Sequence, residues 1–282
     1  MMRTLKRRVA AKTHICFLLA GALLVLLETT CFAAERPGSE FKMQIRNRLE
    51  VIASTEGLSP ADTYGRWNTL NMNYFRQARE DTLVYAQLTG HSRKEGGGLQ
   101  AGFGVIKDWN KSFFTNTSIG TGTNVSFLPS YSIDHDFNFK FGKDKRYIWS
   151  VGGAYIKYHT DQSDLILKTG VAAYLNKWVL DYHVYRNISN PGSVESFSHR
   201  FSIAYGLPKR SWTTLTYSFG RQAYLAAALA TPSLVNNESQ FVSLNYRRWL
   251  GPHHGFIAEV NYLNLIEAYN KLGFSLGFFR EY

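Results

Sequence analysis

The chain ends with the twelve residues KLGFSLGFFREY (271–282), in which apolar side chains alternate with small or polar ones. One side of an extended chain would carry Leu272, Phe274, Leu276, Phe278 and Tyr282, and the other Gly273, Ser275, Gly277 and Glu281. A period of two residues indicates a β-strand whose two faces meet different environments.

The same alternation recurs along the chain from residue 41 onward. Apolar faces lie in residues 41–51, 70–74, 99–105, 133–141, 165–175, 178–184, 197–205, 242–246 and 256–262. The opposite faces carry Ser, Asn, Gly, Lys and Asp, with no second apolar layer. The segments run about 10 to 13 residues, which suffices for a tilted crossing of a bilayer, whereas ordinary strands average about 5 or 6.

Connections between the segments are predicted to alternate in length. Short turns are expected near residues 78–81, 107–110, 142–146, 176–177, 207–210 and 251–253, and longer loops near 54–66, 91–97, 123–130, 157–162, 189–196 and 223–237. Such alternation is typical of transmembrane barrels. We therefore expect an all-β fold, one antiparallel transmembrane β-barrel of about fourteen strands, with twelve as the alternative and a soluble sandwich disfavoured. Both termini would then be periplasmic.

Tryptophan placement favours the same interpretation. Five of the six tryptophans lie within a few residues of an expected short turn, namely Trp109, Trp149, Trp178, Trp212 and Trp249. Amphipathic rings prefer the headgroup layer. These five are predicted to form one girdle at the periplasmic rim, and the alternative is scattered core tryptophans.

The N-terminus has the features of an export signal. Residues 1–14 contain five basic residues and no acid, and residues 15–27, ICFLLAGALLVLL, are apolar. This run is shorter than the roughly 20 residues of a membrane helix and fits a secretory signal peptide, although an uncleaved anchor is the alternative. We expect residues 1–33 to be the signal, cleaved near Ala33, residues 34–40 a short periplasmic segment, and residues 41–282 the barrel. Both cysteines would leave with the signal, so a disulfide framework is excluded.

Composition narrows the class of protein further. Of the 282 residues, 15% are aromatic and 19% are charged, so the chain is neither disordered nor fibrous. The formal net charge is +11, partly from the signal. Basic loops facing an anionic leaflet explain this charge without a nucleic-acid partner.

Two resemblances add to this reading. The alternating last strand, closing on Tyr282, resembles the signal that the outer-membrane barrel assembly machinery recognises, although Arg280 departs from the usual pattern. Residues 67–70, 118–131, 149–158 and 169–174 resemble the YaiO family of outer-membrane β-barrels. The resemblance implies a Gram-negative outer-membrane location and a weak link to envelope polysaccharide or biofilm systems. It carries no catalytic or ligand residues.

Chemically suggestive residues are few. The seven histidines after the signal show no metal spacing, and the nearest approach to a catalytic triad is His159, Asp161 and Ser163 by one expected loop. Residues 96–98, all glycine, are expected to form a loop and not a phosphate cradle. Residues 224–230 are the one expected helical turn, which would cap or constrict the outer mouth. No catalytic, cofactor or metal residues are assigned.

Polar side chains on the strand faces point to two uses of the lumen. Asp134, Asp136 and Asn138 share one face, as do Lys42, Gln44, Arg46 and Arg48. They would form internal salt bridges or line a polar conduit. We expect a non-enzymatic, passive, narrow pore for saccharide or small polar solutes, associated with envelope or exopolysaccharide processes. The alternatives are a closed barrel that anchors a partner and, less favoured, a lipid-modifying enzyme at the rim. Expected partners are outer-membrane lipids, lipopolysaccharide and the barrel assembly machinery.

Overall fold

The structure is a computed structural model that describes residues 47–221 and 238–282. The expected signal, the 34–40 segment, the start of the first predicted strand and the predicted helical turn at 224–230 lie outside the described residues. None of the helices among the described residues has the length and apolar character that a membrane crossing requires.

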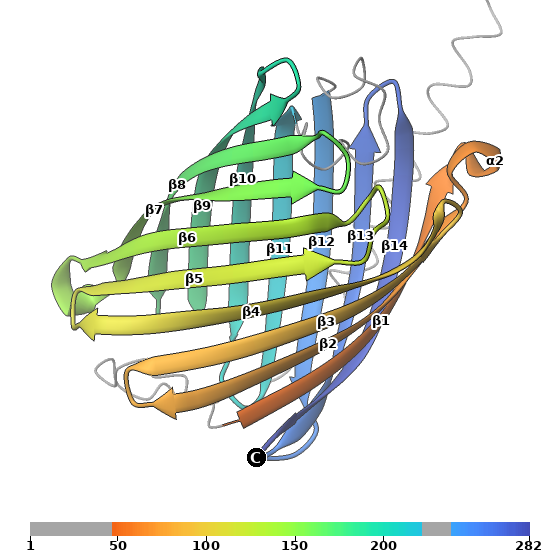
Figure 1. The fold of residues 1–282 in the computed structure, drawn as a ribbon. Helices are drawn as coiled ribbons and strands as arrows, with labels where there is room; N and C mark the ends of the chain where they lie inside the picture. Colours follow the sequence, from red (N-terminus) through yellow and green to blue (C-terminus); the bar gives the residue numbers. More distant parts are fainter. Residues whose placement is uncertain (1–46, 222–237) are drawn as a thin grey trace, which may run out of the picture. The chain divides into compact units, whose positions relative to one another are not determined.

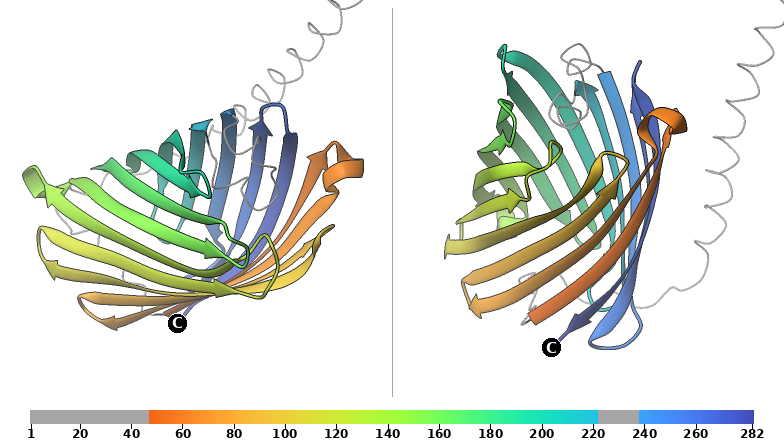
Figure 2. Two further views of the ribbon diagram at one scale, coloured as in Figure 1. Left: turned by 45° about the horizontal axis from the view of Figure 1, so that its top comes forward. Right: turned by 45° about the vertical axis from the view of Figure 1, so that its right-hand side comes forward.

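Fourteen antiparallel strands form a closed barrel, which confirms the expected count over the alternative of twelve (Figures 1 and 2). The strands are β1 (Asn47–Ser59), β2 (Arg66–Arg79), β3 (Thr82–Arg93), β4 (Gly96–Asn110), β5 (Phe113–Gly122), β6 (Pro129–Phe141), β7 (Tyr147–Tyr158), β8 (Ser163–Leu175), β9 (Trp178–Asn190), β10 (Val194–Leu207), β11 (Ser211–Arg221), β12 (Glu238–Trp249), β13 (His254–Leu265) and β14 (Tyr269–Glu281). Each strand pairs with the next along the chain. Among the described residues, two short helical segments, α2 (Ala61–Tyr64) and η2 (Lys143–Lys145), lie in connections.

The barrel closes between its first and last strands, as the sequence predicts. β14 pairs with β1 in antiparallel register, with Val51 opposite Phe278 and Ala53 opposite Leu276. Closure gives every strand two partners, so no unpaired sheet edge meets lipid.

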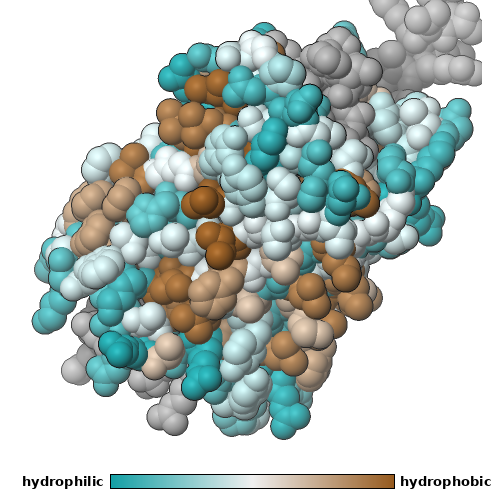
Figure 3. Space-filling model, viewed as in Figure 1, coloured by the Kyte–Doolittle hydropathy of each residue, from teal (hydrophilic) through white to brown (hydrophobic). Residues whose placement is uncertain are grey.

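Alternation places apolar side chains on the outside. Large exposed residues include Leu70, Phe103, Ile133, Phe201 and Leu276, the last of which is 70% exposed. Figure 3 shows apolar residues mostly over the middle of the strands and hydrophilic ones gathered toward the ends. Such an apolar surface fits lipid, because soluble monomers rarely expose large apolar patches.

Two outward-facing histidines have a hydrogen-bond partner on a neighbouring strand, because a polar group that faces lipid cannot hydrogen-bond to water. His135 Nδ1 lies 2.8 Å from Thr117 Oγ1, and His199 Nδ1 lies 2.9 Å from Tyr182 Oη.

The two ends of the barrel differ. We call the end that holds Asn47 and Tyr282 the turn end, and the opposite end, which holds α2 and the β5–β6 connection, the loop end. At the turn end the predicted turns match connections 80–81, 142–146, 176–177, 208–210 and 250–253. The turn predicted at 107–110 is wrong, because β4 continues to Asn110 and the connection is 111–112.

The predicted long loops are too long at several places. The connections are 60–65, 94–95 and 191–193, where loops of 54–66, 91–97 and 189–196 were expected, so the strict alternation of lengths is wrong. Glycines 96–98 belong to β4 and not to a loop. Backbone pairing needs no apolar side chains, so hairpins such as β3–β4 extend beyond the apolar band through polar residues.

The tryptophan prediction is right about the end and wrong about two side chains. All five lie at turn-end strand termini, and Trp109, Trp149 and Trp178 face outward, 61%, 45% and 48% exposed. Trp249 instead points inward, with Nε1 3.4 Å from Glu281 Oε2. Trp212 is also inward, because it is three residues from lipid-facing Leu215 and side chains alternate. The girdle therefore has three members and not five.

Candidate functional site: the lumen and its loop-end mouth

Charged side chains meet inside the barrel on the wall formed by β6 to β10. Lys168 Nζ donates to Asp134 Oδ1 and Oδ2 at 2.8 and 2.7 Å and to Asp136 Oδ2 at 3.0 Å. Next to this group, Arg200 Nη2 donates to Asp181 Oδ1 at 3.1 Å. The Asp134–Asp136 face therefore forms internal salt bridges, as one of the two interpretations held.

The same wall is accessible to water. The Arg200 side chain is 41% exposed and that of Asp134 is 32% exposed, although both point into the barrel. Gln87 of β3 is another exposed inward side chain. These exposures show that solvent-accessible space lies beside this wall.

The opposite wall is packed with paired charges near the turn end. Glu50 Oε1 accepts hydrogen bonds from Arg247 Nη1 and pairs with Arg48 Nε, both at 2.7 Å, and its side chain is only 5% exposed. Glu281 pairs with Lys209 and lies 4.0 Å from Arg48 Nη1. The Phe279 ring, fully buried, lies 4.9 Å below the Arg247 guanidinium. Arg48, Glu50 and Glu281 are thus buried beside groups of opposite charge.

An apolar cluster fills the loop end next to the same strands. Its buried members are Leu58, Trp67, Leu263, Leu265 and Tyr269, and Tyr64 of α2 packs on it. The Tyr64 and Tyr269 rings lie 5.0 Å apart. The sequence-based expectation of an inner face without an apolar layer is therefore wrong for β1, β2, β13 and β14.

The β5–β6 connection (123–128) turns into the barrel and narrows its loop-end mouth. Phe127 and Leu128 are 6% and 2% exposed, although they belong to a connection. Leu128 packs directly over Gly98 of β4, where a Cβ would lie 2.7 Å from Leu128 Cδ1. The lack of a side chain at Gly98 is what allows this approach.

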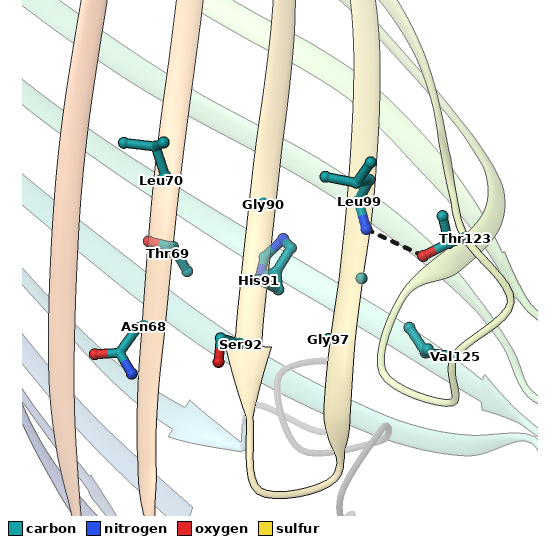
Figure 4. Close-up of a pocket in the computed structure, with 11 residues that line it drawn as sticks. Asn68, Thr69, Leu70, Gly90, His91, Ser92, Gly97, Leu99, Thr123 and Val125 are labelled. Atoms are coloured by element: carbon teal, nitrogen blue, oxygen red, sulfur yellow. Dashed lines mark hydrogen bonds between the residues drawn. The ribbon is translucent and has the colours of Figure 1, made fainter.

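The connection is anchored to β4 by two hydrogen bonds, one through its backbone and one through the Thr123 side chain, the second of which Figure 4 shows. Thr123 N donates to Leu99 O at 2.9 Å, and Leu99 N donates to Thr123 Oγ1 at 3.0 Å. An open depression of 690 Å³ follows β2, β3 and β4 beside it.

Arg93 forms the polar centre of this mouth. Its guanidinium carbon lies 4.1 Å from the Trp67 ring centroid and 4.2 Å from that of Phe127, so the group is held between two aromatic faces. Among the described residues no carboxylate lies within 4.0 Å of it, and Glu56 pairs instead with Lys271 at 2.8 Å. The mouth therefore combines flat apolar faces with a planar hydrogen-bond donor.

The other residues singled out in the sequence are not assembled into a site. His159 Nε2 contacts Gly122 O at 3.0 Å, and no hydrogen bond joins His159, Asp161 and Ser163 in the described part of the chain. Within residues 47–221 and 238–282 there is no group of three His, Cys, Asp or Glu side chains able to hold a metal ion. The expected constriction by residues 223–237 lies outside the described residues.

Sequence reasoning missed Arg93, Phe127 and Leu128. The hydropathy pattern places Arg93 in a loop, and it places Phe127 and Leu128 in a connection without a role. Their apolar pair, followed by Pro129, was the available signal, because a connection at a membrane surface has no need of two adjacent large apolar residues.

Several solved structures share this fold. The CymD monoaromatic hydrocarbon channel has a TM-score of 0.58 at 8% identity, covering 85% of this chain and 89% of that one. A bacterial polysaccharide outer membrane secretin has a TM-score of 0.56 at 8% identity, covering 84% and 99%. The P. putida toluene transporter TodX has a TM-score of 0.54 at 8% identity, covering 84% and 90%. At these identities the likeness establishes the fold alone.

No curated protein sequence matches the chain. A family model described as the YaiO membrane beta barrel domain matches residues 46–225, more than half of the chain. The match confirms the resemblance found in the sequence: the chain belongs to the YaiO family and is an outer-membrane β-barrel.

Proposed function

We propose that this barrel is a passive, narrow conduit for small polar solutes, constricted at its loop-end mouth by the β5–β6 connection. The observation that carries the proposal is the exposure of inward charges on the β6–β10 wall, above all Arg200 and Asp134. Barrels of eight strands are filled by side chains and those of sixteen to eighteen leave a channel, so fourteen fits a narrow lumen.

The chemistry of the mouth favours saccharide-like solutes. Sugars present apolar C–H faces and hydroxyl edges, which match the Trp67 and Phe127 rings and the Arg93 guanidinium between them. Of the three structures named above, one is named for polysaccharide and two for hydrocarbons, so they do not decide the solute. An association with exopolysaccharide processes is part of this proposal.

The partners we propose follow from the surfaces. The outward apolar band suits outer-membrane lipids and lipopolysaccharide, and the β14 strand ending at Tyr282 suits the barrel assembly machinery. We propose neither a nucleic-acid partner nor a catalytic role. Export by a signal cleaved near Ala33, with both termini periplasmic, completes the proposal.

A second function, a closed barrel that anchors a partner protein, is favoured by one specific observation. The apolar cluster and the Glu50 ion network place buried side chains over one side of the interior. If side chains also filled the lumen beside the β6–β10 wall, no solute would pass.

Conductance distinguishes the two functions. The purified barrel, reconstituted in planar bilayers, should give small discrete current steps, and proteoliposomes should swell in pentose or disaccharide solutions. A matched empty-liposome preparation controls for leakage. If neither current nor swelling is seen, and removing Phe127 and Leu128 by double alanine substitution does not produce either, the conduit is refuted in favour of the anchoring barrel.

A further inference from the structure

Oxygen atoms gather inside the barrel near the loop ends of β8, β9 and β10. Asp164 of β8 stands opposite Ser189 of β9, and Asn187 of β9 stands opposite Ser196 of β10. Because residues two apart share a face, the four side chains point the same way, into the barrel. Each of Asp164, Asn187 and Ser196 is at most 2% exposed, and Ser189 is 6% exposed.

The carboxylate in this group has hydrogen-bond donors but no cationic partner. Ser189 Oγ donates to Asp164 Oδ1 at 2.5 Å, and Tyr158 Oη lies 3.4 Å from Asp164 Oδ2. No Lys, Arg or His of the described residues comes within 4.0 Å of Asp164, whereas the lumen carboxylates Asp134, Asp136 and Asp181 all have one. A buried charge without an opposite charge is strongly disfavoured.

Two further oxygens in the group have unused acceptor capacity. Asn187 Nδ2 donates to Ser189 Oγ at 3.0 Å, which leaves Asn187 Oδ1 buried and without a partner among the described residues. Ser196 Oγ is likewise buried and unpartnered there. Buried polar atoms are nearly always satisfied, so these two atoms indicate a missing electropositive neighbour.

We propose that Asp164, Asn187, Ser189 and Ser196 form a calcium-binding site that joins β8, β9 and β10. Carboxylate, amide and hydroxyl oxygens are the ligands of hard cations, and Ca²⁺ accepts irregular sets of six to eight oxygens with water completing them. Mg²⁺ is disfavoured because it demands near-ideal octahedral geometry. Only one carboxylate contributes, so the affinity belongs to the weak range of extracellular modules, with Kd about 0.1–1 mM.

The consequence is local to the loop end. A bound ion would neutralise Asp164 and cross-link three strands where they leave the apolar band, beside the water-accessible wall described above. The inference does not depend on solute passage, since it holds equally for a closed barrel.

Terbium luminescence tests the site directly, because Tyr158 can sensitise an ion held by Asp164. The whole barrel in detergent, freed of metal with EDTA, should give saturable Tb³⁺ emission that Ca²⁺ displaces at about 0.1–1 mM and Mg²⁺ displaces far more weakly. Asp164→Asn should lose the signal, and Ser196→Ala should weaken Ca²⁺ competition several-fold. Glu195→Gln is the matched control, because Glu195 precedes Ser196, faces outward and pairs with Arg186 at 2.8 Å.

Each result decides the proposal. Folding of every variant is checked by migration on an unheated gel, and Ser196→Ala provides the answer if Asp164→Asn does not fold. No saturable emission from the parent barrel, or equal emission from Glu195→Gln, Ser196→Ala and Asp164→Asn, would show that water or a proton satisfies these oxygens and would overturn the site.

Discussion

Replacing Gly98 by alanine should open the loop-end mouth. The added Cβ would lie 2.7 Å from Leu128 Cδ1 and 3.0 Å from both Thr123 Oγ1 and Val125 Cγ2. Carbon atoms pack best at about 3.5–4.0 Å, so all three contacts are compressed at once. The β5–β6 connection is the part expected to move, since β4 is paired with β3 at Gly98 and with β5 from Gln100 onward.

The size of the effect follows from the cost of overpacking. Inserting a methyl group into a filled space typically costs about 1–3 kcal/mol. If swinging the connection outward relieves that strain, the outward population rises about 5- to 150-fold. If rotation of the Leu128 side chain relieves part of the strain, the rise in the outward population falls at the lower end of this range.

Gly102→Ala is the matched control for this change. Gly102 lies four residues along β4 on the same inward face, and its added Cβ would meet nothing closer than Ile119 O at 3.6 Å. The readout is the labelling rate of a Phe127→Cys side chain by a water-soluble thiol reagent, with conductance as a second measurement. Equal labelling rates in the Gly98→Ala and Gly102→Ala backgrounds would refute the packing of the connection into the mouth.

Three further predictions follow from the described side chains. Gln87→Cys should react with a hydrophilic thiol reagent in liposomes, whereas Leu88→Cys should not, because Leu88, 48% exposed, faces lipid. The reverse result would show that the faces of β3 are assigned wrongly. Leu276→Arg, in the middle of β14, should impair membrane insertion by about 2–4 kcal/mol, and Phe278→Arg, nearer the strand end, by less, as urea unfolding in lipid measures; unchanged stability of both would contradict a lipid-facing β14. Glu50→Gln should destabilise the barrel by about 3–5 kcal/mol, because Arg48 and Arg247 would lose their shared carboxylate, and a loss under 1 kcal/mol in the same assay would mean that the network is hydrated.

Much of the fold follows from alternation alone. Lipid requires one apolar face from every strand, so residues such as Phe137, Val171 and Phe274 identify their strands and facing without any knowledge of partners. Strand ends are less predictable, since Ser92 and Arg93 continue β3 through backbone pairing that leaves no mark on hydropathy. The inward direction of Trp212 can nevertheless be predicted from the sequence, because Trp212 and Leu215 are an odd number of residues apart and so lie on opposite faces of the strand.

The lumen could be predicted only in part, because its contacts join residues far apart in sequence. The pairing of Asp134 with Lys168 follows once strand facing is known, but the register that brings Glu50 to Arg247 spans 197 residues. The stacking of Arg93 between Trp67 and Phe127 depends on an inward connection that no strand pattern describes. Tertiary packing, and not local propensity, decides these positions.

The contacts that close the barrel and the exposed charges of the lumen lie on different walls. The joint between β1 and β14 requires segments more than 200 residues apart to meet, which carries the largest loop-closure entropy in the molecule. Glu56–Lys271 bridges that joint directly, and the Glu50 network and the apolar cluster lie beside it. Packing this wall tightly offsets the entropy, while the β6–β10 wall, built from consecutive hairpins that form locally, is free to hold water and exposed charge. Substitutions at the joint should therefore change stability with little effect on selectivity, and substitutions such as Arg200→Ala should shift ion selectivity toward cations with little effect on stability.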